Sequence, residues 1–165
     1  MNRISYGTVV EISQHNIDVK HDIVNRLYIS VTLLNELRMY GLASPDREVC
    51  GLITGDVQGT SWQPNKFTPI TNVSTGKYGY DDYVMDPNES LDVLERTSHF
   101  PGESISDLVA VFHTHPNSTP YPSAIDIRHA AYNVIYIIYS LAYDEFTFNM
   151  WDGSWFRPVK VEVIE

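Results

Sequence analysis

The chain has 165 residues, of which 43% are hydrophobic and 12% aromatic, enough apolar side chains for one folded domain. Its formal charge of −10 argues against a nucleic-acid partner, because a nucleic-acid-binding surface needs clustered Lys and Arg. Cys50 is the only cysteine, which excludes a disulfide within the chain. The sequence has neither an apolar signal segment nor an apolar run of the ~20 residues that span a membrane, so we expect a cytoplasmic protein.

The first part of the chain predicts strands around one helix. Apolar residues alternate from Ile4 to Ile12, the period of a strand, whereas residues 13–26 are polar and predict a loop or arm. A short strand at Leu27–Ile29 precedes a helix from Val31 to about Tyr40, which begins at a serine cap and is expected to stop at Gly41.

The middle of the chain predicts two long strands, a loop and a second helix. Arg47–Thr54 has the composition of a central strand, and Trp62–Val73 predicts another strand or pair, interrupted by its two prolines. The tyrosine- and glycine-containing segment 74–83 suits either a mobile flap beside a groove or an inert loop. Asp86 caps a helix that is expected to run from Pro87 to about Ser98.

The last part of the chain alternates strands and one helix. The expected elements are a strand that begins near Asp107 and ends in two histidines, a helix over about 124–133, a buried strand over 134–141, and strands at 145–151 and 155–163 joined by an Asp-Gly turn. We therefore predict a single α/β domain with a mixed β-sheet and about three helices. Residues 1–27 would form an amino-terminal strand and arm, and residues 28–165 the globular domain.

Four polar residues between His113 and Asp126 predict a metal site. His113 and His115 would share one face at the end of the strand, because side chains alternate along a strand. Ser123 can cap the next helix, whose first turn carries Asp126. Two imidazoles and one carboxylate, with an open fourth position, are typical of catalytic zinc. Each feature alone is common: a Ser-x-x-Asp pair is more often a capping box, and a His-x-His pair is often incidental.

Glu48 is the best candidate for the acid/base residue of such a site. It is a carboxylate in an otherwise apolar predicted strand, where a charge is costly unless it has a partner. Zinc-activated water would be such a partner, because its proton must pass to an acid/base residue and then to the leaving amine.

These residues together resemble the JAMM/MPN+ metalloprotease signature. The match consists of Glu48, then His113-Thr114-His115, seven residues, Ser123, two residues and Asp126. The Gly-Leu-Ile-Thr-Gly run after Glu48 also resembles the family's first long strand, and the likeness covers roughly residues 28–155.

The resemblance implies a cytidine-deaminase-like MPN fold and a zinc metallopeptidase. It implies that His113, His115 and Asp126 bind one Zn²⁺, that Glu48 is the general acid/base, and that Ser123 stabilises the oxyanion. Family members hydrolyse peptide or isopeptide bonds, often behind a ubiquitin-like protein, so a protein or peptide substrate is expected. The small size and the prolines before Ser123 look most like bacterial, archaeal and tailed-phage members.

Several alternatives remain open on the sequence alone. The domain could serve phage tail assembly, process cell-wall peptides or act as a non-catalytic MPN scaffold, and RadC-like proteins carry a related His-x-His-Pro stretch. Tyr78, Tyr80 and Tyr83 suit either a peptide-binding loop or scattered loop aromatics. Cys50 is expected to be a buried apolar residue, and His129 an ordinary surface histidine.

Overall fold

The computed structural model describes residues 12–14, 17–19, 26–76, 82–97 and 107–165. Strands in this part of the chain are β1 (Ile12–Gln14), β2 (Ile17–Val19), β3 (Arg26–Ser30), β4 (Cys50–Gln58), β5 (Ser61–Ile70), β6 (Asp107–His115), β7 (Ile135–Ser140), β8 (Glu145–Trp151), β9 (Phe156–Pro158) and β10 (Val161–Ile164). Its helices are α1 (Val31–Leu42), α2 (Pro87–Leu94) and α3 (Ala124–His129).

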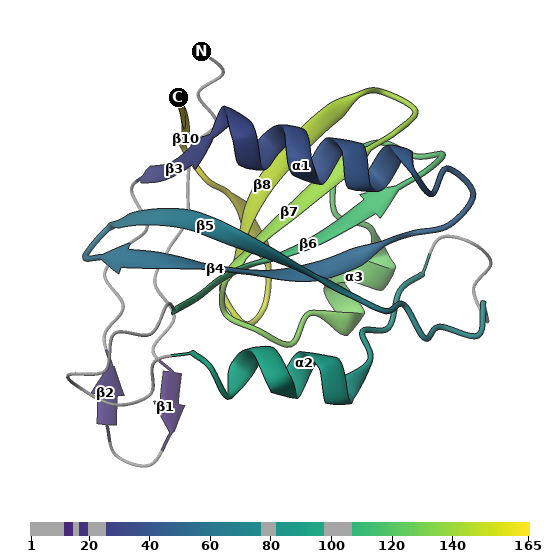
Figure 1. The fold of residues 1–165 in the computed structure, drawn as a ribbon. Helices are drawn as coiled ribbons and strands as arrows, with labels where there is room; N and C mark the ends of the chain where they lie inside the picture. Colours follow the sequence, from purple (N-terminus) through teal and green to yellow (C-terminus); the bar gives the residue numbers. More distant parts are fainter. Residues whose placement is uncertain (1–11, 15–16, 20–25, 77–81, 98–106) are drawn as a thin grey trace.

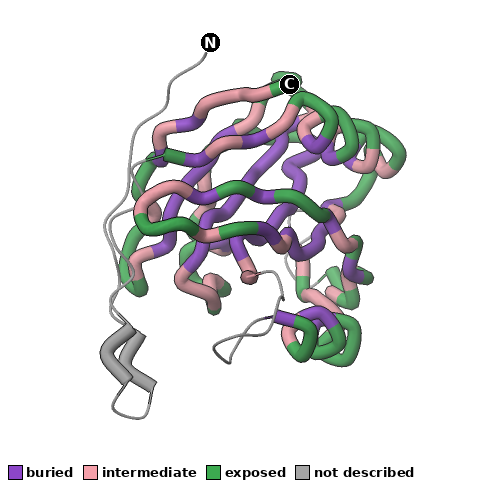
Figure 2. The backbone as a smooth tube through the Cα atoms, turned by 60° about the vertical axis from the view of Figure 1, so that its left-hand side comes forward, coloured by how far each residue is buried: buried purple, intermediate pink, exposed green. Residues whose placement is uncertain are grey.

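A mixed sheet organises the fold, as predicted. Its eight strands follow the order β10-β3-β5-β4-β6-β7-β8-β9, with β6 parallel to β7 and antiparallel to β4. Helix α1 crosses one side of this sheet, and α2 and α3 lie on the other side (Figure 1). The central strands are buried along most of their length (Figure 2), and every residue of β7 is buried, which confirms the predicted buried strand.

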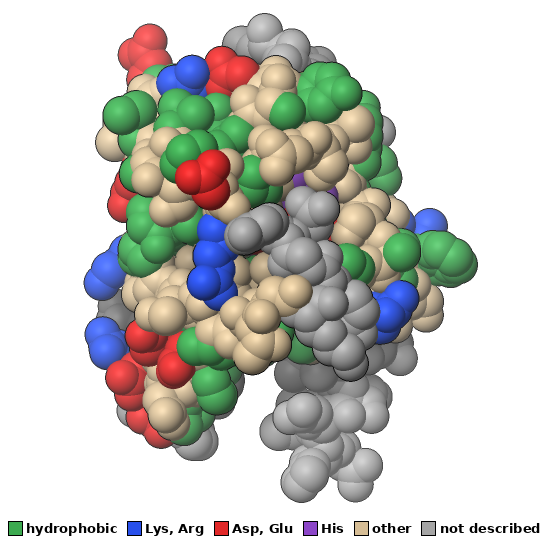
Figure 3. Space-filling model, turned by 90° about the vertical axis from the view of Figure 1, so that its right-hand side faces the viewer, with side chains coloured by type: hydrophobic (Ala, Val, Ile, Leu, Met, Phe, Trp, Pro, Cys, Tyr) green, Lys and Arg blue, Asp and Glu red, His purple; other side chains and the backbone are tan. Residues whose placement is uncertain are grey.

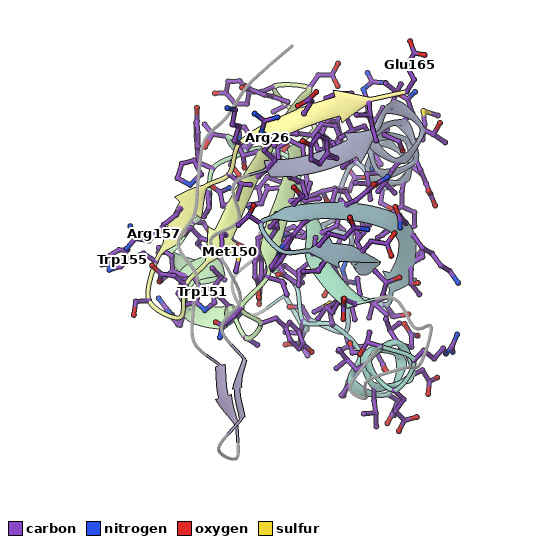
Figure 4. The ribbon with its side chains drawn as sticks, turned by 90° about the vertical axis from the view of Figure 1, so that its left-hand side faces the viewer. Arg26, Met150, Trp151, Trp155, Arg157 and Glu165 are labelled. Carbon is purple, nitrogen blue, oxygen red and sulfur yellow. The ribbon has the colours of Figure 1, made fainter. Side chains whose placement is uncertain are left out.

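The two ends of the sheet meet through consecutive residues near the carboxyl terminus. Val159 donates its N–H to Phe148 O of β8 at 2.9 Å, and Lys160 O accepts from Leu27 N–H of β3 at 2.9 Å. Figure 4 shows this segment running from Arg157 past Arg26 towards Glu165. The prediction of one strand over 155–163 is therefore wrong, because β9 extends one end of the sheet and β10 extends the other.

Two predicted strands differ from the observed ones. Strand β4 begins at Cys50 and continues to Gln58, so it lies later in the chain than the predicted Arg47–Thr54. Strand β5 is not interrupted by Pro64 or Pro69, because it pairs with β3 only at Ser61 and Trp62. Pro64 and Pro69 come after these two residues, so their lack of an N–H group removes no hydrogen bond to β3. On the side of β4, a register shift next to Gly55 accommodates Pro64.

The amino-terminal prediction is tested only in part. Segment 13–26, predicted as a loop or arm, contains most of β1 and all of β2, which pair antiparallel with each other. The predicted strand over residues 4–12 lies outside the described residues, except Ile12. The division into an arm of residues 1–27 and a domain of residues 28–165 stays a prediction.

Helices α2 and α3 begin where the sequence predicts but are shorter. The Asp86 carboxylate caps α2, accepting from Asn88 and Glu89 N–H at 2.9 Å each, and the helix ends at Leu94. Helix α3 ends at His129 instead of continuing to residue 133. The next amides, Ala131 and Tyr132 N–H, donate to the Tyr136 hydroxyl of β7 at 3.1 and 3.2 Å, so a tertiary contact replaces the helical bonds. None of the helices described is long and apolar enough to cross a membrane.

Gly41 lies inside α1 and does not stop it, which corrects the prediction. The Ser30 cap is present, with Leu33 N–H 3.1 Å from Ser30 Oγ, but the helix continues to Leu42. A Cβ atom on Gly41 would lie 2.8 Å from Thr114 Cγ2 and 3.1 Å from Tyr139 Cδ1. Glycine is thus needed for the close approach of α1 to β6 and β7.

The connection between β7 and β8 is also bound to α1, through Asp144. Arg38 Nε and Nη2 donate to the two carboxylate oxygens of Asp144 at 2.7 and 3.0 Å, and the Tyr139 hydroxyl donates to the same carboxylate. The Arg38 guanidinium, followed by the Tyr139 hydroxyl, lowers the pKa of Asp144 to about 2. Asp144 also has a positive φ of 50°, which asparagine tolerates well.

We expect Gly41→Ala to lower the free energy of unfolding by about 1–3 kcal/mol, the usual cost of overpacking. Helix propensity alone predicts the opposite sign, a gain of about 1 kcal/mol. Urea denaturation would distinguish the two, with Asn35→Ala on the exposed side of α1 as the control. A stabilised Gly41→Ala variant would contradict the close-packing account.

Asp144→Asn is expected to lower the melting temperature above about pH 4, the pKa range of an aspartate in an unfolded chain. Because folding lowers the pKa of Asp144, its contribution is full above that range and disappears as the pH falls towards 2. The wild-type and variant melting curves should therefore converge in acid. A difference that is independent of pH would show that the ionised carboxylate is not responsible; exposed Asp46→Asn serves as the control.

Candidate metal centre

Strand β6 presents both predicted histidines on one face. His113 and His115 are buried at the carboxyl end of the strand, and their Nε2 atoms lie 3.1 Å apart. Thr114, between them, points to the other face, where its methyl group lies against Gly41 of α1. After the strand ends, Thr119 O lies 2.7 Å from His115 Nδ1.

A capping box at the start of α3 brings Asp126 to the histidines. Ser123 Oγ accepts from Asp126 N–H at 3.2 Å, and Asp126 Oδ2 accepts from Ser123 N–H at 2.6 Å. The carboxylate, fixed in this way, lies with Oδ1 2.9 Å from His113 Nε2 and Oδ2 3.2 Å from His115 Nε2. The box predicted for Ser123 and Asp126 is therefore present, and it also orients the carboxylate towards the imidazoles.

The donor atoms of His113, His115 and Asp126 fit a tetrahedral metal ion. One ligand atom from each lies within 4.8 Å of the other two. A tetrahedral Zn²⁺ with bonds of about 2.0–2.2 Å requires ligand atoms roughly 3.3–3.6 Å apart, slightly more than the observed 2.9–3.2 Å. The contact with Thr119 O favours a proton on His115 Nδ1, which leaves the Nε2 lone pair directed at the other two residues.

Burial and charge favour the protonation states that bind metals. Burial lowers the pKa of His113, which keeps its imidazole neutral. Burial alone would raise the pKa of the Asp126 carboxyl, but the imidazoles of His113 and then His115 outweigh it and hold that pKa far below its usual range. A neutral His113 imidazole and an ionised Asp126 carboxylate are the forms in which these side chains bind a divalent cation.

Glu48 lies beside these residues but not in a strand, which corrects the sequence prediction. It is 3% exposed and precedes β4 by two residues. Val49 N–H donates to Thr114 Oγ1 at 3.0 Å, and Val49 O accepts from Thr114 N–H at 3.1 Å. Since Cys50 pairs with His113, continuing this register places Glu48 next to His115 and on the same face.

Tyr83 closes another side of the centre. Its ring stacks on His113 with centroids 4.4 Å apart and an interplanar angle of 28°. Tyr83 also lines a cavity of about 580 Å³ between α2 and the α3–β7 connection. Residues Tyr78 and Tyr80, considered together with Tyr83 in the sequence, lie outside the described residues. On the face shown in Figure 3, a small patch of histidine surface is visible among other side chains.

Asn72 was missed by sequence reasoning. Its side chain bonds the backbone of Glu48 and that of the segment before Tyr83, although it is distant from both in sequence. An asparagine after a strand is commonplace in loops, so its residue type gives no signal of this role. His129, predicted to be a surface histidine, lies with Nδ1 3.5 Å from the buried Asp82 carboxylate.

Comparison with known proteins places the chain in a family. The family described as prokaryotic homologs of the JAB domain matches residues 30–152. The chain belongs to this family. The resemblance to JAMM/MPN+ proteins, and to their prokaryotic members, is thereby confirmed.

Named relatives match most of the chain. A protein named desampylase from Haloferax volcanii is 30% identical over 133 residues, 80% of this chain and 89% of the relative. A protein named probable TtuB-protein conjugate cleaving protease from Thermus thermophilus is 30% identical over 113 residues, 68% of this chain and 69% of the relative.

Solved structures share the fold at lower identity. A protein from Desulfitobacterium hafniense has a TM-score of 0.69 at 22% identity, covering 84% of this chain and 93% of that one. A JAB1/MPN domain protein from Archaeoglobus fulgidus has a TM-score of 0.51 at 16% identity, covering 84% of this chain and 97% of that one. These likenesses confirm the predicted α/β MPN fold.

His113→Ala should weaken binding of a divalent cation by more than about 100-fold. Loss of a residue that only hydrogen-bonds a metal ligand costs about 10- to 100-fold in affinity, and loss of a ligand itself costs more. Calorimetric titration of metal-free protein with Zn²⁺ would measure this. His129→Ala is the matched control, since it removes a histidine outside the three-residue cluster. Equal losses in both variants, or none in either, would contradict the assignment of the cluster.

Proposed function

We propose that the protein is a zinc-dependent isopeptidase that hydrolyses the bond between a ubiquitin-like modifier and a protein amine. The observation that carries the proposal is the convergence of His113, His115 and Asp126 beside the buried Glu48. The names of the two relatives, one a desampylase and one a probable protease of TtuB-protein conjugates, support a conjugate as substrate.

His113, His115 and Asp126 would hold one Zn²⁺ per chain. The ion, when bound, supplies Lewis acidity that polarises a carbonyl and lowers the pKa of water towards neutrality. Thr119 O, the Ser123 amide and the packing of β6 hold the three ligand side chains in place before the ion arrives, so little ordering is needed on binding.

Glu48 would carry the proton in this reaction. Its carboxylate accepts a proton from the attacking water and delivers it to the leaving nitrogen, which must be protonated before the C–N bond breaks. The buried position of Glu48 suits this role, because a carboxylate screened from bulk water keeps its proton close to the reacting atoms.

Ser123 would stabilise the negative charge that develops on the carbonyl oxygen. Its Oγ atom accepts the Asp126 N–H, and this bond leaves the hydroxyl proton available to a substrate oxygen. A hydrogen bond that strengthens as the oxyanion forms lowers the barrier more than it strengthens substrate binding.

A non-catalytic scaffold is the main alternative function. The complete ligand set with an adjacent buried carboxylate favours catalysis, because buried charged groups without a function are costly to retain. No observation favours a phage-tail or cell-wall role over conjugate cleavage. A cytoplasmic location, where modifier conjugates of intracellular proteins occur, belongs to the same proposal.

Glu48→Gln should retain one Zn²⁺ per chain and lose at least about 100-fold in kcat, the usual contribution of an acid/base residue. The assay follows release of TtuB from a TtuB–protein conjugate by gel electrophoresis, with zinc measured by atomic spectroscopy. Glu36→Gln on the exposed side of α1 is the matched control. The proposal fails if zinc-loaded wild type releases no TtuB, or if Glu48→Gln keeps the wild-type rate.

A further inference from the structure

We propose that Asn72 is a positioning residue that sets the place of Glu48 and of Tyr83 at the metal centre. The inference rests on the proposed function, because it assigns Asn72 an effect on turnover through Glu48. It rests on the hydrogen bonds of the Asn72 side chain, which join it to the backbone of three segments, at Glu48, at Ser74 and at residues 82–84.

Asn72 forms four side-chain hydrogen bonds. Its Nδ2 atom donates to Glu48 O at 2.9 Å and to Asp82 O at 3.2 Å. Its Oδ1 atom accepts from Ser74 N–H at 3.0 Å and from Val84 N–H at 3.0 Å. A primary amide has two donor hydrogens and two acceptor lone pairs, so every one of them is used.

The donor bond to Glu48 fixes the backbone from which the acid/base side chain projects. On the other side, Val49 is held by Thr114, so bonds from two elements flank the Glu48 peptide. Arg47 adds contacts to the same loop, with Nη2 3.1 Å from Asn72 O and 2.7 Å from Ser74 O. Removal of the Asn72 amide would leave Glu48 O without this bond and allow the segment before β4 to shift.

The remaining bonds fix the two ends of the segment between Ser74 and Tyr83. Val73 N–H donates to Val84 O at 2.8 Å, and Ser74 Oγ donates to the Asp82 carboxylate at 3.1 Å. Asn72 bonds both of these segments, and Tyr83, which stacks on His113, lies between two of its partners, Asp82 and Val84. Asn72 therefore anchors the described ends of segment 74–83, for which the sequence suited either a flap or an inert loop.

Only an asparagine-sized amide meets all of these demands. Aspartate keeps both acceptor bonds but has no hydrogen to donate to Glu48 O or Asp82 O. Alanine keeps none of the four bonds. Asn72→Asp thus removes the two donor bonds, to Glu48 O and Asp82 O, and keeps the acceptor bonds that anchor the Ser74 and Val84 amides.

The test compares Asn72→Ala and Asn72→Asp with wild type in the zinc-loaded full chain. The probe is the TtuB–protein conjugate, and kcat, KM, zinc content and melting temperature are measured. Misplacement of a reacting group by about 1 Å costs up to about 100-fold in rate, so we expect kcat to fall about 10- to 100-fold in both variants with zinc content unchanged. KM should rise in Asn72→Ala but stay near the wild-type value in Asn72→Asp.

Asn65→Ala is the matched control, because Asn65 makes one exposed side-chain bond, to Asp56, and lies away from the centre. It should leave kcat unchanged. The inference is overturned if the Asn72 variants keep kcat within twofold of wild type, or if they lose activity only in proportion to lost zinc. A wild-type protein that releases no TtuB despite bound zinc would instead overturn the proposed function, and with it the inference.

Discussion

The alternation of side chains along β6 is the constraint on which the centre depends. His113 and His115 can face Asp126 only because Thr114 faces the opposite side of the sheet, towards α1. The same Thr114 uses its hydroxyl and its N–H to hold Val49, one residue from Glu48. Residues 113–115 therefore orient two candidate ligands, pack against α1 and hold the segment that carries Glu48. Gly41 makes room for this packing.

Several buried polar groups are concentrated on this one face, and their contacts reduce the cost of burying Asp126 and His115. The Asp126 carboxylate accepts the Ser123 amide and faces two imidazoles, and His115 bonds Thr119 O. Burial in this setting keeps His113 neutral, while the neighbouring imidazoles keep Asp126 ionised. Cys50, on the neighbouring strand, is buried so deeply that the pKa of its thiol rises to about 12, which agrees with its predicted role as an apolar core residue.

The sequence predicted the parts of the centre that depend on local rules. Strand alternation and the capping box act within a few residues, so the relative placement of His113, His115, Ser123 and Asp126 followed from their spacing. Several properties that depend on contacts distant in sequence were not predicted. Gly41 looked like a helix stop because its neighbours Thr114 and Tyr139 are remote in sequence, and β9 and β10 looked like one strand because closure of the sheet has no local signal.

Asn72 also makes contacts that local sequence rules do not predict, and these contacts indicate that two parts of the centre are held in different ways. The three candidate ligands lie on β6 and α3, elements fixed by the buried core and by a helix cap. Glu48 and Tyr83 lie outside regular elements, and their positions depend on hydrogen bonds from single side chains in loops. The candidate ligands and the two loop residues are therefore held in place by different interactions. Substitutions in the loops would displace Glu48 or Tyr83 and leave the three candidate ligands in place, because β6 does not depend on Asn72 for its register.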